Sequence, residues 1–378
     1  MSDTKSADIY QDLGIRRVVN AVGTATVMGG AVLSPRVQEA MDQASQAYAS
    51  MEEVVSRAGE AIASDLGAEA AFVTSGCFAA LAISCAAVMT GPDTDLIARL
   101  PNTSGLRNQF LIQNRHRYHY DRCVSVPGGK LVEVGDENGV TRSQFEDAIG
   151  PDTAGVLYPA HMDGAEGTLS LNEVVSIAAA RDIAVVVDAA FQVYPVQRMK
   201  DIASCGADSI CFSAKYMGGP NSVGFMLGKK PLVEAARLHG FTAFELEDNR
   251  AFGRGFKVDR GEVVALVAAM REWFTLDHQE RARDQERRFQ VLVELLGDIP
   301  HVMLQQGWFG QIPWMQLRVV LDEEALGMTV TQAADALKVL DPSIWTRPDG
   351  DALSIAVSTL QPGEERLVAH GLRQVLLP

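Results

Sequence analysis

The chain has 378 residues, of which 47% are apolar and 21% are charged. This length is too great for one small core and predicts one large domain with a smaller one. The net charge of −15 opposes binding to nucleic acid or to an anionic membrane surface, so we expect neither as a partner. An anionic substrate would need a local basic pocket.

The sequence shows no sign of export or of a membrane span. Its N-terminus is polar, and no apolar run is long enough to cross a bilayer. The five cysteines are odd in number and lack CxxC spacing, so we expect no disulfide framework and no zinc site. Reduced thiols in the cytoplasm are the simplest interpretation.

Residues 1–20 are expected to form an arm, and two helices follow it. Ser34 and Pro35 are typical of an N-cap and a first helical turn, which predicts a helix from Arg36 to about Tyr48. A second helix is predicted over about Met51–Leu66.

Short apolar runs then alternate with helical patterns as far as residue 227. The predicted strands are residues 70–73, 110–112, 130–134, 154–158, 185–187, 209–212 and 223–227. The predicted helices between them include an alanine-rich one that ends near Met89, and two near residues 143–148 and 171–181. This α/β alternation predicts a mostly parallel sheet of the seven-stranded type, with helices on both faces.

The pattern changes from about residue 255. One long helix is predicted over roughly Arg260–Leu296, and its charge run at residues 280–288 is expected to be a solvated face. Strands at 314–320 and 353–357 and helices near 329–339 and 364–376 complete a small α+β C-terminal domain. The predicted organisation is an arm (1–20), a large domain (21–254) and a small domain (255–378).

Asp188 and Lys215 are the most informative pair in the sequence. Asp188 closes the buried apolar run 183–187, and Lys215 lies in a small-residue loop just past the strand 209–212. Pyridoxal 5'-phosphate (PLP) requires a lysine that forms a Schiff base with its aldehyde and an acid that keeps its pyridine nitrogen protonated. The pair therefore predicts PLP as the cofactor. Taken singly, Asp188 would also serve as a structural cap and Lys215 as a solvated charge.

A glycine-containing turn between a strand and a helix is the candidate phosphate site. Helix N-termini bind phosphate through free N–H groups, and Gly76 allows close backbone approach. A plain tight turn is the alternative. Beside Lys215, a serine can donate to a phosphate oxygen and two glycines form a close-approach loop. The candidates for cofactor binding are Ser75, Gly76, Cys77, Ser213, Gly218 and Gly219.

Two further residues are candidates for cofactor or substrate contacts. His116 lies in the segment with the densest local positive charge, residues 115–120, where it would stack on the cofactor ring or form a surface strand end. Arg347 is a candidate for bidentate capture of a substrate carboxylate, with a surface-turn arginine as the alternative.

Together these residues resemble fold type I PLP enzymes. Within them the chain is similar to the selenium-transferase-like group that includes the D-glucosaminate-6-phosphate ammonia-lyases. The resemblance runs over nearly the whole chain. The segments that carry it are residues 19–24, 51–59, 120–135, 160–169, 187–190, 212–215 and 253–259.

The resemblance implies a role for each candidate. Lys215 would hold the cofactor and shuttle the Cα proton, and Asp188 would pair with the pyridinium. The phosphate would be held by Ser75, Gly76, Cys77 and Ser213, with Gly218 and Gly219 reaching a neighbouring subunit's phosphate in a homo-oligomer. Arg347, Arg117 and Asn20 would contact the substrate, and Arg117, Arg254 and Lys257 are the candidates for a substrate phosphate.

The expected reaction is α,β-elimination on a hydroxy amino acid, such as a 2-amino sugar acid, to give a 2-keto acid and ammonia. Lys215 would take the Cα proton, and His116 or His161 would give a proton to the leaving hydroxyl. A racemase, or a β-replacement enzyme like the selenium transferases, is the alternative within PLP chemistry.

Overall fold

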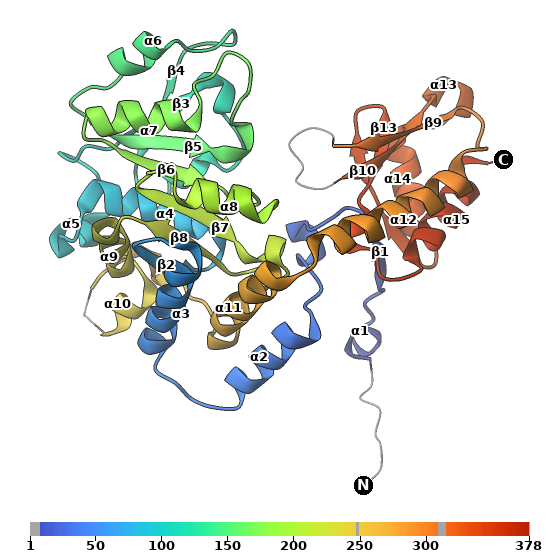
Figure 1. The fold of residues 1–378 in the computed structure, drawn as a ribbon, viewed down its shortest axis with the longest axis horizontal. Helices are drawn as coiled ribbons and strands as arrows, with labels where there is room; N and C mark the ends of the chain where they lie inside the picture. Colours follow the sequence, from blue (N-terminus) through green and yellow to red (C-terminus); the bar gives the residue numbers. More distant parts are fainter. Residues whose placement is uncertain (1–7, 247–248, 309–314, 378) are drawn as a thin grey trace. The chain divides into compact units, whose positions relative to one another are not determined.

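The computed structural model describes residues 8–246, 249–308 and 315–377 (Figure 1). Within them the chain forms two compact units. The larger unit is the continuous stretch Ala31–Thr275, and the smaller one joins the described residues up to Gly30 with those from Leu276 onward. Each unit has an apolar core of its own. The domain boundaries given by the sequence, at residues 20/21 and 254/255, stay predictions.

A seven-stranded sheet forms the centre of the larger unit, which confirms the fold predicted from the alternating pattern. The strand order is β2-β8-β7-β6-β5-β3-β4, and only β8 runs antiparallel to its neighbours. Strands β5, β6 and β7 are almost fully buried, as their continuous apolar runs require. The bounds are β2 Ala70–Thr74, β3 Gln109–Gln113, β4 Lys130–Val134, β5 Thr153–Pro159, β6 Ala184–Asp188, β7 Ser209–Ser213 and β8 Gly224–Gly228.

Helices cover both faces of this sheet (Figure 1). The most buried is the alanine-rich α4, which packs against β6, β7 and β8 and has apolar residues on all sides. Ser34 caps α2 as predicted, because its hydroxyl accepts from the backbone N of Val37 at 3.2 Å. The bounds are α2 Pro35–Ser45, α3 Met51–Leu66, α4 Gly76–Thr90, α5 Thr94–Arg99, α6 Arg142–Asp147, α7 Leu171–Ala180, α8 Val196–Ala203, α9 Lys230–Leu238, α10 Phe241–Leu246 and α11 Arg260–Thr275.

The smaller unit is α+β, as the sequence predicted. An antiparallel sheet has the order β12-β13-β10-β9, and β1 pairs in parallel with β11. The strands are β1 Val18–Asn20, β9 Val302–Gly307, β10 Gln316–Leu321, β11 Ser343–Trp345, β12 Arg347–Asp349 and β13 Ala352–Ile355. The helices are α1 Ile9–Asp12, α12 His278–Leu296, α13 Glu323–Leu326, α14 Val330–Val339 and α15 Glu364–Leu376.

The prediction of one long helix over Arg260–Leu296 was wrong. The chain forms α11 and α12 with a break at Leu276 and Asp277. Asp277 is the N-cap of α12, since its carboxylate accepts from the backbone N of Glu280 at 2.9 Å. The predicted strand 314–320 corresponds to β10, although its first residue, Trp314, lies outside the described residues.

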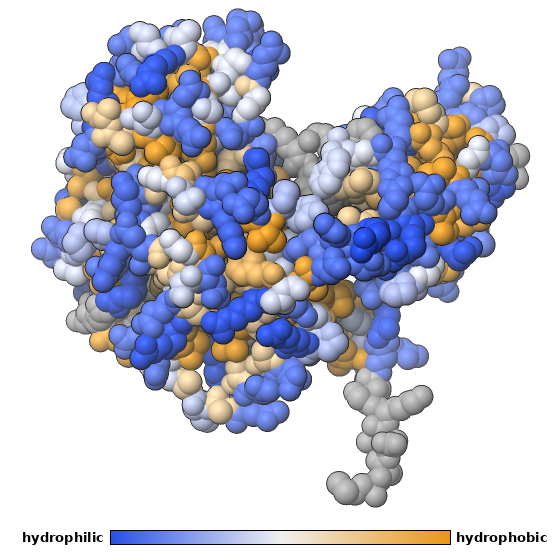
Figure 2. Space-filling view, in the orientation of Figure 1, coloured by the Kyte–Doolittle hydropathy of each residue, from blue (hydrophilic) through white to orange (hydrophobic). Residues whose placement is uncertain are grey.

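The charge run on α12 is a solvated face, as expected. Glu280 pairs with Arg283 and Arg287, and Asp284 pairs with Arg287 and Arg288. Figure 2 shows hydrophilic residues gathered over this helix. Exposed pairs of this kind contribute little to stability. In the part of the chain that the structure describes, no helix is both long and apolar enough to span a membrane.

Candidate active site

The predicted site residues of the larger unit follow the carboxyl ends of parallel strands. The five strands are β2, β3, β5, β6 and β7. They run in the same direction, so the segments after them meet at one edge of the sheet. Strand β2 leads into Ser75, β3 into His116, β5 into His161 and β7 into Lys215, and β6 ends at Asp188.

The carboxylate of Asp188 is buried and held by three neighbours. Its Oδ1 accepts from the backbone N of Ala190 at 3.0 Å and lies 3.7 Å from the Sγ of Cys77. Its Oδ2 accepts from the hydroxyl of Tyr118 at 2.6 Å. Asp188 is only 5% exposed, so this carboxylate has a fixed orientation at the edge of the sheet.

Lys215 lies on the short 3-10 helix η5 (Ala214–Met217), directly after β7, and is 8% exposed. Burial lowers the pKa of its amine, and the nearby thiol of Cys77 opposes this effect. Its Nζ lies 5.1 Å from the centre of the Tyr216 ring. A lysine in such a place loses its proton more readily than an exposed one, as a nucleophilic amine must.

The thiol of Cys77 connects the two residues. Burial raises its pKa, Asp188 raises it further, and Lys215 lowers it. The thiol is therefore within electrostatic reach of both the acid and the lysine. This brings the first turn of α4 together with the end of β6 and with η5.

The N-terminus of α4 leaves room for an anion. Gly76 has a φ of +83°, and a Cβ added there would meet nothing within 4 Å. Ser75 is the N-cap, yet its side chain makes no capping hydrogen bond. Free N–H groups at such a terminus attract phosphate.

The sequence analysis missed a glycine that supports this turn. A Cβ on Gly224 of β8 would lie 2.6 Å from the carbonyl carbon of Gly76 and 2.7 Å from the backbone N of Cys77. Only glycine allows β8 to pass so close to the start of α4. Its signal was the run Val223-Gly224-Phe225, in which a glycine interrupts an apolar strand pattern.

The loop after β7 is tight. Ser213 ends the strand and is 5% exposed, and its side chain does not cap η5. Gly218 has a φ of +81°, and a Cβ on Gly219 would lie 2.8 Å from the Cβ of Ala214. Both glycines are thus required by the local backbone, and their reach to a second subunit stays a prediction.

His116 is enclosed behind the sheet edge. It is 1% exposed, its Nδ1 lies 3.2 Å from the Nε2 of Gln113, and its ring packs edge-on against Tyr158 at 5.0 Å. Burial lowers its pKa to about 4, so the ring is neutral. Its predicted stacking on the cofactor stays a prediction, and these contacts describe a ring already packed on protein.

A cluster of rings stands closer to Asp188. The distances between ring centres are 5.4 Å for Tyr118 and His161 and 5.2 Å for His161 and Phe191. The ring centres of Phe191 and Tyr216 are 5.7 Å apart. Burial lowers the pKa of His161, and the charge of Asp188 opposes this effect. The sequence analysis named only His161 among these four. Tyr118 carried one signal, its place in the singled-out segment 115–120.

The arginines predicted for substrate binding in this unit are already paired. Arg117 pairs with Asp121 at 2.5 Å and also with Glu133. Arg254 pairs with Glu245, whereas Lys257 is exposed. A substrate phosphate bound by Arg117 or Arg254 would have to compete with these carboxylates.

Arg347 and Asn20 belong to the smaller unit. Arg347 is exposed on β12, opposite Ser354 of β13. The side chain of Asn20 closes a turn, because its Oδ1 accepts from the backbone N of Val22 at 3.0 Å and its Nδ2 donates to the carbonyl of Gly23 at 3.2 Å. Their predicted contacts with substrate stay predictions.

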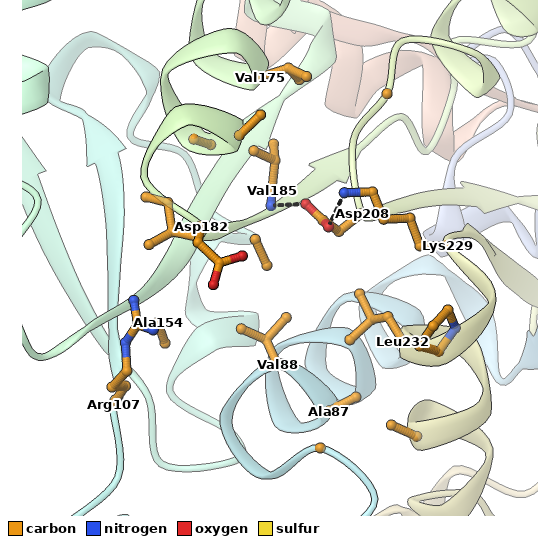
Figure 3. A pocket seen from close by; sticks show the side chains of 18 of the residues that line it. Ala87, Val88, Arg107, Ala154, Val175, Asp182, Val185, Asp208, Lys229 and Leu232 are labelled. Carbon is orange, nitrogen blue, oxygen red and sulfur yellow. Dashed lines mark hydrogen bonds and ion pairs between the residues drawn. The ribbon is translucent and has the colours of Figure 1, made fainter.

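A groove of about 470 Å³ lies at the opposite, amino-terminal edge of the same sheet (Figure 3). It contains none of the predicted site residues. Its polar side chains are Arg107, Asp182, Asp208 and Lys229, and its remaining lining is mostly aliphatic. The carboxylate of Asp208 is satisfied by the backbone N of Val185 at 2.8 Å and by Lys229 at 2.7 Å.

The carboxyl edge has the groups that PLP requires. A buried lysine, an oriented carboxylate and an open helix N-terminus lie together there. Among the described residues, no set of three or more His, Cys, Asp or Glu side chains is arranged to hold a metal ion.

The chain is similar to several known proteins over nearly its whole length. Residues 129–304 match the family Aminotransferase class-V. The chain is 28% identical to D-glucosaminate-6-phosphate ammonia lyase of Salmonella typhimurium, over 97% of this chain and 98% of that protein. It is 29% identical to 5'-C-glycyluridine monooxygenase-decarboxylase of a Streptomyces species, over 97% of this chain and 92% of that protein. It is 25% identical to L-seryl-tRNA(Sec) selenium transferase of Moorella thermoacetica, over 97% and 84%.

Solved structures share the fold. The structure of D-glucosaminate-6-phosphate ammonia-lyase matches with a TM-score of 0.81 at 27% identity, covering 98% of each chain. A serine palmitoyltransferase structure with its PLP internal aldimine matches with a TM-score of 0.57 at 14% identity, covering 94% of this chain and 87% of that one. We conclude that the chain is a PLP-dependent enzyme of fold type I that is similar to the selenium-transferase-like group.

Proposed function

We propose that the protein is a lyase that removes ammonia from a 2-amino-3-hydroxy acid by α,β-elimination. The substrate would be a 2-amino sugar acid, such as D-glucosaminate or its 6-phosphate, and the products a 2-keto acid and ammonia. One observation carries the proposal. The Asp188 and Lys215 site occurs in a chain that matches an ammonia-lyase over 97% of its length and with a TM-score of 0.81.

Each residue group at the carboxyl edge would have its own role in the reaction. When bound, PLP supplies a ring that accepts electrons from the substrate Cα. The Nζ of Lys215, whose pKa is lowered by burial, would take the proton from the substrate Cα. Asp188 would pair with the pyridine nitrogen, and the N-terminus of α4 would hold the cofactor phosphate.

We infer that His161, rather than His116, assists the leaving β-hydroxyl, by a hydrogen bond donated from its neutral ring. It is partly exposed, and it stands in the ring cluster beside Asp188. His116 is enclosed and packed on Tyr158. Loss of water across the Cα–Cβ bond leaves an enamine, which tautomerises and takes up water to release the keto acid and ammonia.

The test is product analysis on purified protein supplied with PLP. D-Glucosaminate, its 6-phosphate and both enantiomers of serine would be offered, and ammonia and keto acid measured together. Equal amounts of the two products support the proposal. Replacement of Lys215 by alanine is expected to lower the rate about 10³-fold or more, because it removes the base. Lys230→Ala is the matched control, since Lys230 is exposed and pairs with Glu234 on α9.

A second candidate rests on the 29% identity to a monooxygenase-decarboxylase. In that case the reaction would consume O₂ and release CO₂, which an oxygen electrode and a carbonate assay would detect. A racemase, the other alternative, would place solvent deuterium at Cα without releasing ammonia. Either result, in place of ammonia release, contradicts the lyase proposal.

We further propose that the protein works as a homo-oligomer in the reducing cytoplasm, with sites shared between subunits. Several large apolar side chains near the N-terminal part of the chain support an oligomer, because Val27, Val32 and Tyr48 are each more than three-quarters exposed. The five cysteines form no disulfide, and four of them are buried. Light scattering coupled to gel filtration measures the oligomeric state, and a monomeric mass would contradict this proposal.

A further inference from the structure

The phenol of Tyr118 contributes the shortest hydrogen bond to Asp188. Its hydroxyl lies 2.6 Å from Oδ2, whereas the thiol of Cys77 lies 3.7 Å from Oδ1. Burial raises the pKa of Tyr118 well above its ordinary value, and Asp188 adds to this effect. The hydroxyl therefore stays protonated and acts as a donor. A hydrogen bond given to a carboxylate stabilises its charged form.

The backbone of Tyr118 is fixed by its own loop. Asp121, 3% exposed, accepts from the backbone N of Tyr118 at 3.3 Å, and its own backbone N donates to the carbonyl of Tyr118 at 3.2 Å. Asp121 is in turn held by Arg117, which also pairs with Glu133 on β4. The loop that contains Tyr118 is thus held in place by hydrogen bonds and ion pairs.

Three thiols and one imidazole around Asp188 are neutral at pH 7. Burial raises the pKa of the thiols of Cys77 on α4, of Cys123 on the short helix η3 (Asp121–Val124), and of Cys211 on β7, the last to about 12. The pKa of His161 is lowered. Tyr118 is therefore the strongest side-chain donor among these described neighbours of the acid.

We propose that Tyr118 is a positioning residue, whose hydroxyl holds the carboxylate of Asp188 turned toward the pyridine nitrogen of the cofactor. This inference rests on the proposed function only in taking PLP as the cofactor. It assigns to Tyr118 no contact with the amino acid substrate. It therefore predicts an effect on cofactor affinity that needs no substrate to be seen.

The test is a double-mutant cycle on PLP binding to the full-length apoprotein. The dissociation constant of PLP would be measured for wild type, Tyr118→Phe, Asp188→Ala and the double variant. Loss of the phenol hydroxyl is expected to weaken PLP binding about tenfold in wild type, because hydrogen bonds to charged groups are stronger than neutral ones. In the Asp188→Ala background, the same change is expected to raise the dissociation constant of PLP by less than about twofold.

Tyr158→Phe is the matched control. Tyr158 is a buried tyrosine whose hydroxyl likewise donates to a carboxylate, that of Asp163, at 2.7 Å. This variant is expected to lose stability while it keeps the wild-type affinity for PLP. Thermal melting of each apoprotein, together with the visible absorption band of each PLP-loaded form, separates a loss of folding from a loss of cofactor binding.

Three outcomes would overturn the inference. An unchanged PLP affinity in Tyr118→Phe would show that the hydroxyl does nothing for the acid. An equal loss in both backgrounds would show that Tyr118 acts without Asp188. Failure of the wild type to bind PLP would remove both this inference and the proposed function. A tenfold, Asp188-dependent loss in a protein that makes no keto acid would keep the inference and reject only the lyase reaction.

Discussion

The two edges of the central sheet use an aspartate in opposite ways. At the carboxyl edge, Asp188 accepts from a phenol and approaches a thiol, both brought from other elements of the fold. At the amino edge, Asp208 accepts from the backbone N of Val185 on the neighbouring strand and pairs with Lys229 just after β8. The carboxylate of Asp188 lies in the candidate active site, whereas the carboxylate of Asp208 connects neighbouring strands. An acid next to a strand is therefore informative only when its partners are known.

The largest expected difference between the edges concerns the two acids themselves. Asp188→Ala would remove the partner of the cofactor's protonated pyridine nitrogen, which costs about 3–5 kcal/mol and corresponds to a loss of about 10²–10⁴-fold in kcat. Asp208→Ala is expected to lower the free energy of unfolding by about 1–3 kcal/mol, with kcat per folded molecule unchanged. Steady-state kinetics and urea unfolding of both variants measure these effects. Equal losses of kcat would remove the distinction.

The two ends of β8 provide the next comparison. Gly224 lets the strand pass the first turn of α4, and Gly228 lets it pass the carbonyl of Asp208. Alanine at either position is expected to cost about 1–3 kcal/mol of stability, because the added methyl meets backbone atoms. Only Gly224→Ala should also weaken PLP binding, by about tenfold, since it displaces the helix N-terminus. Similar PLP affinities in the two variants would refute the assignment of the phosphate site to α4.

The smallest expected effect is a pH dependence that comes from two buried histidines of the larger unit. Burial lowers the pKa of His116 and of His239 to about 4, below the value of about 6.5 in an unfolded chain. The unfolded chain then takes up protons first on acidification. The stabilising contribution is complete above about pH 6.5 and is lost progressively as the pH falls towards 4.

His239 offers a way to measure half of this effect. Its Nε2 lies 2.9 Å from the hydroxyl of Thr90, and glutamine would keep a polar partner there. Between pH 7 and pH 5 we expect about 2 kcal/mol to be lost per histidine, so His239→Gln should lose about half as much as wild type. Urea unfolding at both pH values measures this. The same loss in the variant would mean that His239 is not neutral in the folded protein.

The strands of the central sheet were predictable because burial on both faces requires continuous apolar runs. The residues of β6 and β7 are of this kind, and the acid and the lysine stand at their ends. In the smaller unit, β9 has an irregular burial pattern and β11 is three residues long, so neither leaves a periodic signal. The break between α11 and α12 was missed because the apolar and charged pattern continues on both sides of Asp277.

The contacts within the site were harder to predict than its members. Asp188 and Lys215 could be named from the strand that precedes each. The bond from Tyr118 to Asp188 joins residues 70 positions apart, and it exists only because β3 and β6 flank β5 in the sheet. His116, two residues before Tyr118, was the more familiar candidate for a ring contact. In the fold its ring packs edge-on against Tyr158, and its stacking on the cofactor stays a prediction.

The pairing of β1 with β11 has a consequence for the order in which the protein is built. Val18 lies beside Ser343, so one strand of the smaller unit leaves the ribosome before the larger unit and its partner strand leaves after it. The larger unit is one uninterrupted stretch and contains the whole seven-stranded sheet. During synthesis this sheet can be completed while β1 still waits for its partner. We therefore expect the larger unit to fold on the ribosome before the smaller unit can be completed.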